Sequence, residues 1–150
     1  MTRPGLSVLF LCTGNSARSQ LAEVILRHIS RGRVQVASAG SAPQPEIHPM
    51  ARIAARKLLN VEMEGQHPKL LDEFLGQRFD YVITVCDRAA ESCPSFPGGP
   101  ERLHWSFDDP AAVQGADEDR QRAFDNVARA LLGRVRLWME LPGVNATLSR

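Results

Sequence analysis

The sequence predicts an α/β fold, namely a doubly wound four-stranded parallel sheet with helices on both faces. Short apolar runs alternate along the chain with longer segments in which apolar residues recur at helical spacing. The first run is almost continuously apolar, as parallel strands buried on both faces are. The 150 residues, 43% of them hydrophobic, suit a single domain over residues 1–150 with a core of ordinary size.

The first strand is expected over residues 6–11, which are apolar except for one serine and form a run too short for a helix. From Ser19 onward the apolar residues recur every three or four positions, which predicts an amphipathic helix. Gly32 interrupts that pattern and ends the helical segment. The chain therefore opens with a strand, a short loop and a helix.

Residues 34–37 predict a second strand that ends in the small residues Ser38, Ala39 and Gly40. A second helix is expected over residues 50–59, directly after His48 and Pro49. Proline favours this position because the first turn of a helix needs no amide hydrogen from it. The second strand and helix repeat the order of the first pair.

In the second half of the chain, residues 70–75 suggest a short helix and residues 81–85 form the clearest β-branched run, expected as a central strand. Residues 103–105 are a candidate fourth strand. The last helix is expected over residues 117–140, with one apolar face. We expect Pro142 and Gly143 to end it and to release a polar tail.

Composition excludes several classes of protein. Eighteen basic and seventeen acidic residues leave a net charge of +1 with no long basic run, so we expect no nucleic-acid partner. No apolar stretch approaches the roughly 20 residues that span a bilayer, and residues 1–5 lead straight into a strand, so we expect a cytoplasmic protein. Three cysteines, an odd number, favour reactive thiols over a disulfide framework.

The strand-to-helix junction carries the main functional signal. Backbone amides of a tight glycine-containing loop, together with the positive end of the following helix, can hold a tetrahedral anion. Arg18 can grip two of its oxygens, and the same field predicts that Cys12 is largely thiolate near neutral pH and nucleophilic. The alternative is a buried structural cysteine with Arg18 as a surface charge. The predicted cradle consists of Cys12, Thr13, Gly14, Asn15, Ser16, Ala17, Arg18 and Ser19.

A second cysteine, Cys86, follows the predicted central strand, so Cys12 and Cys86 both lie at carboxyl ends of strands, where open parallel sheets bind ligands. Cys93 lies seven positions further on. If the intervening polar segment is helical, the two Cα atoms lie about 10.5 Å apart, whereas a disulfide needs less than roughly 7 Å. The spacing favours a redox switch that unravels the segment, with a zinc site or two inert cysteines as the alternatives.

The acidic pair Asp108 and Asp109 precedes Pro110 and is expected near the same edge. A carboxyl group there can protonate a leaving oxygen, although such a sequence also suits a plain turn. Within the cradle, we expect Asn15 to stabilise the loop through side-chain hydrogen bonds and Ser19 to donate one to the sulfur of Cys12.

The chain resembles the low-molecular-weight protein tyrosine phosphatases, and within them the thioredoxin-coupled arsenate reductases. The residues that carry the resemblance run in one order along the chain: Cys12 to Glu23, Ser38 to Gly40, His48-Pro49, Cys86 to Cys93 and His104 to Pro110. The resemblance implies a low-molecular-weight phosphatase-like fold, arsenate as substrate with phosphate or sulfate as analogues, and thioredoxin as reductant. It also implies redox-active Cys86 and Cys93, and Asp109 as the general acid.

The same resemblance implies no organic cofactor, but Asn15, Glu23 and Ser38 match positions that bind potassium in some of the reductases. Two departures matter. Ala111 and Ala112 stand where the phosphatases usually carry tyrosines, which favours a small inorganic anion, and Ala17 replaces a cysteine that some relatives have in the loop. The rival functions are a phosphatase whose other cysteines only protect it, and a non-catalytic oxyanion-binding or thiol-sensing module. A mycothiol or glutathione system is the alternative to thioredoxin.

Overall fold

The computed structural model describes residues 5–149 of the chain. Its four strands form one parallel sheet in the order β2-β1-β3-β4, which confirms the predicted α/β class. Because β1 has β2 on one side and β3 on the other, the sheet has its topological switch point at β1. The strands are β1 (Leu6–Cys12), β2 (Val34–Gly40), β3 (Tyr81–Thr84) and β4 (Glu101–His104).

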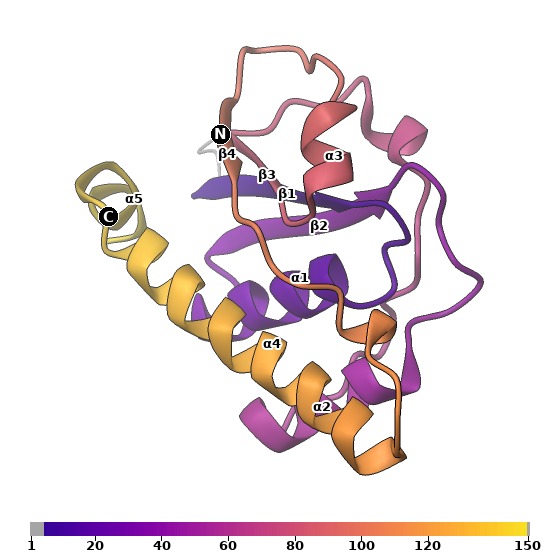
Figure 1. Cartoon of the computed structure of the whole chain (residues 1–150). Helices are drawn as coiled ribbons and strands as arrows, with labels where there is room; N and C mark the ends of the chain where they lie inside the picture. Colours follow the sequence, from indigo (N-terminus) through magenta and orange to yellow (C-terminus); the bar gives the residue numbers. More distant parts are fainter. Residues whose placement is uncertain (1–4, 150) are drawn as a thin grey trace.

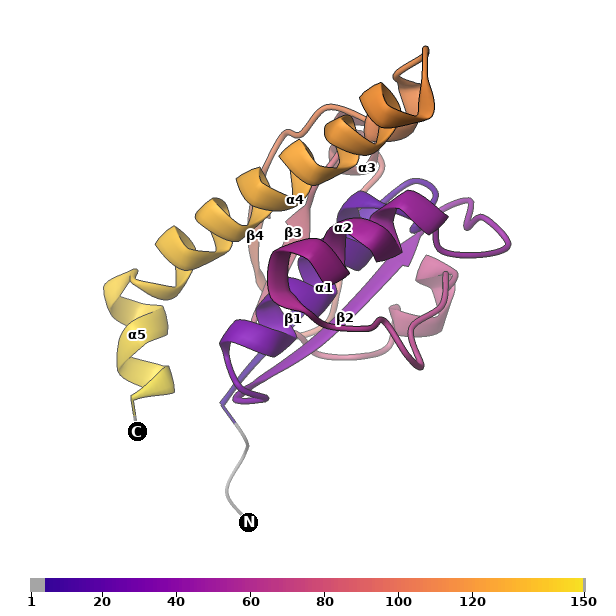
Figure 2. The same ribbon diagram turned by 90° about the horizontal axis from the view of Figure 1, so that it is seen from below.

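Helices cover both faces of the sheet, as predicted. Three of them, α1, α2 and α4, lie on one face, and the short α3 lies on the other (Figure 1). Seen from below, the three larger helices lie in front of the strands (Figure 2). Their bounds are α1 (Arg18–Ile29), α2 (Pro49–Leu59), α3 (Asp87–Glu91) and α4 (Asp117–Met139), with single 3-10 turns at η1 (Leu71–Phe74) and η2 (Pro110–Ala112).

The core is built around β1. Val8, Leu9 and Phe10 have no exposed surface, although successive side chains of a strand point to opposite faces. Both faces are buried because helices cover them, which explains why the run is apolar without alternation. The ring of Phe10 lies 5.9 Å from that of Trp105, the residue that follows β4.

The parallel register brings the ends of β1 and β3 together. Leu11 of β1 pairs with Thr84 of β3. Cys12 comes directly after Leu11 and Cys86 comes two residues after Thr84, so the two cysteines lie at the same end of adjacent strands. Gly40 at the end of β2 pairs with Cys12 on the other side. A Cβ at Gly40 would lie 2.3 Å from the carbonyl oxygen of Thr13, so only glycine allows this approach of β2 to the loop after β1.

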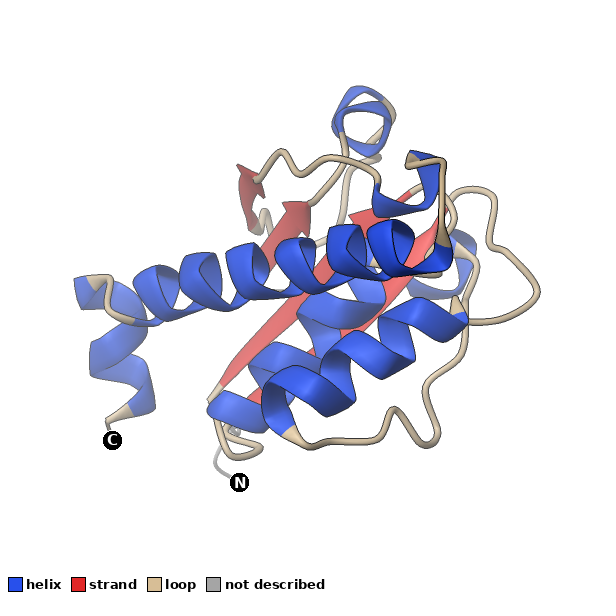
Figure 3. Cartoon of the chain, turned by 60° about the horizontal axis from the view of Figure 1, so that its bottom comes forward, coloured by secondary structure: helices blue, strands red, loops and turns tan. Residues whose placement is uncertain are grey.

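The prediction of a polar tail after Pro142 is wrong. The chain forms a further helix, α5 (Pro142–Leu148), which turns away from the end of α4 (Figure 3). Val144 and Leu148 are buried, so this segment has an apolar face that covers the core, and the proline occupies the first turn, which it does not disrupt. Within residues 5–149, no helix combines the length and apolar character that crossing a bilayer requires.

Candidate active site

The loop between β1 and α1 forms one wall of an open cavity of about 990 Å³ at the carboxyl edge of the sheet. All loop residues from Cys12 to Arg18 line this cavity. The residue before α1 is Ala17, which has no capping side chain, so no side chain competes with an anion for the first amides of the helix. The predicted cradle thus faces a space into which a tetrahedral oxyanion fits.

Asn15 holds the loop in shape. It is fully buried and has a left-handed backbone (φ 49°), which a side chain other than glycine adopts only when its surroundings stabilise it. Its side-chain amide donates to the hydroxyl groups of Ser19 (2.7 Å) and Ser38 (2.9 Å). Its side-chain carbonyl accepts from Gln20 Nε2 (3.0 Å) and from the backbone amide of Lys69 (2.8 Å). All of its side-chain hydrogen-bonding groups are therefore used within the protein.

The sulfur of Cys12 lies inside this network. Its Sγ is 2.7 Å from Ser19 Oγ, and the backbone amide of Asn15 donates to it over 3.2 Å. Because Ser19 Oγ accepts from Asn15, its own proton remains available to the sulfur.

Burial of the sulfur acts against the expected thiolate form of Cys12. Burial raises the pKa of the Cys12 thiol above its ordinary value, and the hydrogen bonds from Ser19 and Asn15 only partly oppose that rise. Desolvation disfavours the charged sulfur more than these donors favour it. A group that takes the proton of Cys12 would therefore favour the nucleophilic form.

Arg18 links the loop to the acidic segment. Its guanidinium donates to the backbone carbonyl of Phe107 over 2.9 Å and lies 4.0 Å from the carboxylate of Asp109. The Arg18 side chain is 16% exposed and that of Asp109 is 49% exposed, so the acid stands toward solvent at the mouth of the cavity. Asp109 also accepts from the amide of Ala111, and Asp108 lines the same cavity. The structure thus brings the predicted acid and the predicted anion-binding arginine together.

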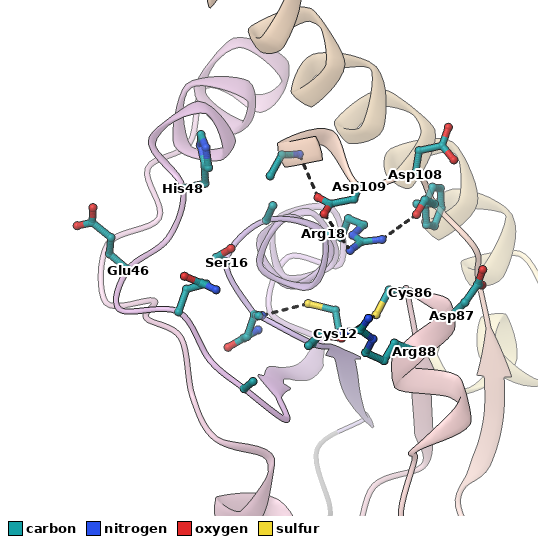
Figure 4. A pocket seen from close by; sticks show the side chains of 18 of the residues that line it. Cys12, Ser16, Arg18, Glu46, His48, Cys86, Asp87, Arg88, Asp108 and Asp109 are labelled. Atoms are coloured by element: carbon teal, nitrogen blue, oxygen red, sulfur yellow. Dashed lines mark hydrogen bonds and ion pairs between the residues drawn. The ribbon is translucent and has the colours of Figure 1, made fainter. Parts of the chain in front are cut away.

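The two sulfurs of Cys12 and Cys86 face the same cavity (Figure 4). Cys86 is buried, and its Sγ lies 3.6 Å from the hydroxyl of Thr13, the residue next to Cys12 in the loop. Cys93 is not among the residues that line the cavity. It follows α3, is partly buried, and burial raises the pKa of its thiol. All three cysteines are free thiols.

The sequence did not predict a hydrogen-bond network at the start of α3, in which His104 and Ser106 bond the side chain of Asp87. The Nε2 of His104 pairs with the carboxylate of Asp87 (2.8 Å), and its Nδ1 bonds the Thr84 hydroxyl (2.8 Å). Ser106 donates to the same carboxylate (3.1 Å), and these bonds lower the pKa of Asp87. The parallel register of Thr84 with His104 creates this contact, so no spacing along the chain indicates it.

His48 has a structural role, although it also lines the cavity. Its Nδ1 accepts from the amide of Met50 and caps α2, and its ring lies 4.4 Å from that of Phe124. Burial lowers the pKa of His48. Its ring is thus held by two structural contacts at the edge of the cavity.

Comparisons with known proteins agree with one another. A family model for low molecular weight phosphotyrosine protein phosphatases matches residues 7–141. An arsenate reductase of Halalkalibacterium halodurans is 37% identical over 133 residues, which cover 89% of this chain and 94% of that protein. A thioredoxin-dependent arsenate reductase of Corynebacterium glutamicum is 29% identical, with a TM-score of 0.62 over 92% of this chain and 65% of that one. An arsenate reductase in its phosphate binding state has the same fold, with a TM-score of 0.71 at 24% identity over 89% and 96% of the two chains.

Proposed function

Because the chain belongs to the low molecular weight phosphotyrosine protein phosphatase family, as its sequence predicted, we propose that it uses this fold to reduce arsenate to arsenite with thioredoxin as the reductant. The proposal rests chiefly on one observation. A second thiol, Cys86, lies against Thr13 in the cavity that the Cys12 loop lines. Hydrolysis of a phosphoester needs only the first thiol, whereas reduction of a bound oxyanion needs a second sulfur to complete a disulfide.

In the first step, the loop amides and Arg18 hold arsenate with its arsenic atom in front of Cys12 Sγ. An oxygen of the arsenate dianion takes the thiol proton, so the substrate itself acts as the base for a thiol whose pKa is raised by burial. The sulfur then bonds to arsenic as one arsenic–oxygen bond breaks. Asp109 protonates that oxygen, which leaves as water.

In the second step, the sulfur of Cys86 attacks Cys12 Sγ as its thiol proton passes to an oxygen of the arsenic group. A sulfur–sulfur bond forms, the sulfur–arsenic bond breaks, and its electron pair remains on arsenic. Two thiols are thereby oxidised to one disulfide while arsenic is reduced from the +5 to the +3 state and leaves as arsenite. The balance needs no further redox partner at this stage.

In the third step, the thiolate of Cys93 attacks Cys86 and releases Cys12. The five-residue helix between them must open for this attack, and only Ala89 in it is buried, so opening it exposes little apolar surface. Thioredoxin, a dithiol, then reduces the Cys86–Cys93 disulfide and restores the starting state.

The decisive experiment measures arsenate-dependent NADPH oxidation with thioredoxin and thioredoxin reductase, in parallel with glutathione and mycothiol systems. We expect turnover with thioredoxin and its loss in both Cys12→Ser and Cys86→Ser. Efficient reduction by Cys86→Ser, or turnover with glutathione or mycothiol but not with thioredoxin, would contradict the proposal.

A phosphatase activity is the second candidate, because Cys12, Arg18 and Asp109 are also the groups that a phosphoester hydrolase needs. Ala111 stands at the mouth of the cavity and provides no aromatic surface for a phosphotyrosine ring. We therefore propose phosphate-ester hydrolysis only as a slow side reaction. Rapid phosphoester hydrolysis without any reductant, in an enzyme that does not reduce arsenate when thioredoxin is supplied, would reverse this order of preference.

A further inference from the structure

Behind the oxyanion loop, outside the cavity, lies a buried carboxylate that the chemistry above does not use. Glu23 on α1 is 5% exposed, and the hydroxyl of Ser38 donates to its Oε1 over 2.6 Å. Two cations flank it: Arg27 bonds its Oε2, and the ammonium of Lys69 lies 3.8 Å from its Oε1. A buried charge requires such compensation.

These contacts decide whether potassium fits beside Asn15, Glu23 and Ser38. Both lone pairs of the Asn15 side-chain carbonyl oxygen accept hydrogen bonds, one from the side chain of Gln20 and one from the backbone amide of Lys69. Each carboxylate oxygen of Glu23 already faces a side-chain cation, and the Ser38 hydroxyl accepts from Asn15 while it donates to Glu23. A potassium ion needs several oxygen atoms free to coordinate it, and a fixed ammonium group repels it. The residues therefore do not fit the ion.

Both the backbone and the side chain of Lys69 are held by hydrogen bonds. Its carbonyl accepts from the amide of Gly40 at the end of β2 (2.9 Å), and its amide donates to Asn15. Its ammonium donates to the carbonyl of His67 (2.8 Å), and the side chain is only 14% exposed. One residue thus ties the loop asparagine to the sheet and supplies a cation to the carboxylate behind it.

We propose that Lys69 is the built-in cation of the oxyanion loop, a positioning residue that makes anion binding and the reactivity of Cys12 independent of potassium. The Glu23 side chain accepts a hydrogen bond from the Ser38 hydroxyl, which leaves the Ser38 oxygen to accept one from Asn15. The Asn15 amide then donates its second proton to Ser19, whose hydroxyl proton is left for the sulfur of Cys12.

The charge of Lys69 also matters at a distance. Without it, the negative charge of Glu23 is less compensated, and in a medium of low dielectric constant that field disfavours both a thiolate and a bound anion. The inference rests on the proposed role of Cys12 as the nucleophile. Its test uses alkylation and anion binding, so that absence of arsenate turnover would count against the proposed function alone.

The experiment has two measurements on the full chain: the pH dependence of iodoacetamide alkylation at Cys12, mapped by mass spectrometry, and the binding of inorganic phosphate by calorimetry. In the wild type we expect both to agree within about twofold in potassium, sodium and choline chloride at equal ionic strength. In Lys69→Met we expect the alkylation profile to move up by about one pH unit, which is about a tenfold lower rate at a fixed pH below it.

Two further variants separate charge from packing. Lys69→Arg keeps the cation and is expected to stay near the wild type. As a matched control, Lys57→Met removes an exposed lysine that pairs with Asp125, and neither of these residues lines the cavity. Phosphate affinity that rises severalfold in potassium chloride over choline chloride in the wild type would overturn the proposal without any variant. So would a folded Lys69→Met that matches Lys57→Met, or a Lys69→Arg that behaves like Lys69→Met.

Discussion

Removal of one hydroxyl group, in Ser19→Ala, tests how the nucleophile is activated. Ser19 Oγ lies 2.7 Å from the sulfur of Cys12 and is fully buried, so water cannot replace it without a rearrangement of the loop. Burial already raises the pKa of Cys12, and this hydrogen bond is the largest contribution that opposes the rise. We expect the pKa of Cys12 to rise further in the variant.

The size of the effect follows from the charge on the acceptor. A hydrogen bond to a charged group contributes about 1.5–3 kcal/mol, against about 0.5–1.5 kcal/mol for a neutral pair. Since the neutral thiol also contacts Ser19, only the difference, about 1–1.5 kcal/mol, bears on ionisation. At about 1.4 kcal/mol per unit, this predicts a rise of about one pKa unit and an approximately tenfold lower thiolate fraction at a fixed pH below the pKa.

The assay is alkylation of Cys12 as a function of pH in a Cys86→Ser/Cys93→Ser background, in which Cys12 is the remaining thiol. Ser30→Ala is the matched control, because Ser30 is equally buried at the opposite end of α1 and its hydroxyl bonds only backbone groups there. The control is expected to leave the pH profile in place while it lowers the free energy of unfolding by about 1 kcal/mol.

The reasoning is refuted if Ser19→Ala alkylates with an unchanged pH profile while thermal unfolding shows an intact fold. A profile that moves to lower pH is equally incompatible with it. Loss of the Ser19 acceptor also leaves one proton of the Asn15 amide unpaired. We therefore expect Ser19→Ala to lower the free energy of unfolding by about 1–3 kcal/mol, up to severalfold more than the control Ser30→Ala.

Three further predictions concern the anion and the order of the thiols. Arg18→Lys keeps its charge but loses the planar two-pronged contact, so we expect phosphate affinity by calorimetry to fall about tenfold or more, and unchanged binding would count against the cradle. Cys86→Ser is expected to hydrolyse para-nitrophenyl phosphate slowly without reductant while it no longer reduces arsenate; parallel loss of both activities would point to a structural role. Cys93→Ser is expected to release about one arsenite per enzyme and to stall as a Cys12–Cys86 disulfide, seen by peptide mapping, whereas sustained thioredoxin-driven turnover would disprove the proposed order.

The fold was predictable because its signals are local. The uninterrupted apolar run of β1 and the β-branched run of β3 are typical of buried parallel strands, and the spacing of apolar residues in α1 and α4 shows which face is buried. The C-terminal helix α5 was missed because proline and glycine dominate its first turn. Its burial depends on a core that other elements build.

The sequence by itself determined the loop chemistry: a cysteine, five residues and an arginine at a strand-to-helix junction predict an oxyanion cradle, since these groups are neighbours along the chain. Tertiary structure decided what surrounds it. Sheet register placed Cys86 beside Thr13 and His104 beside Asp87, and the segment after α2 brought Lys69 to Glu23. Tertiary structure also raises the pKa of Cys12, because desolvation depends on how completely other elements cover the sulfur, which no spacing along the chain encodes.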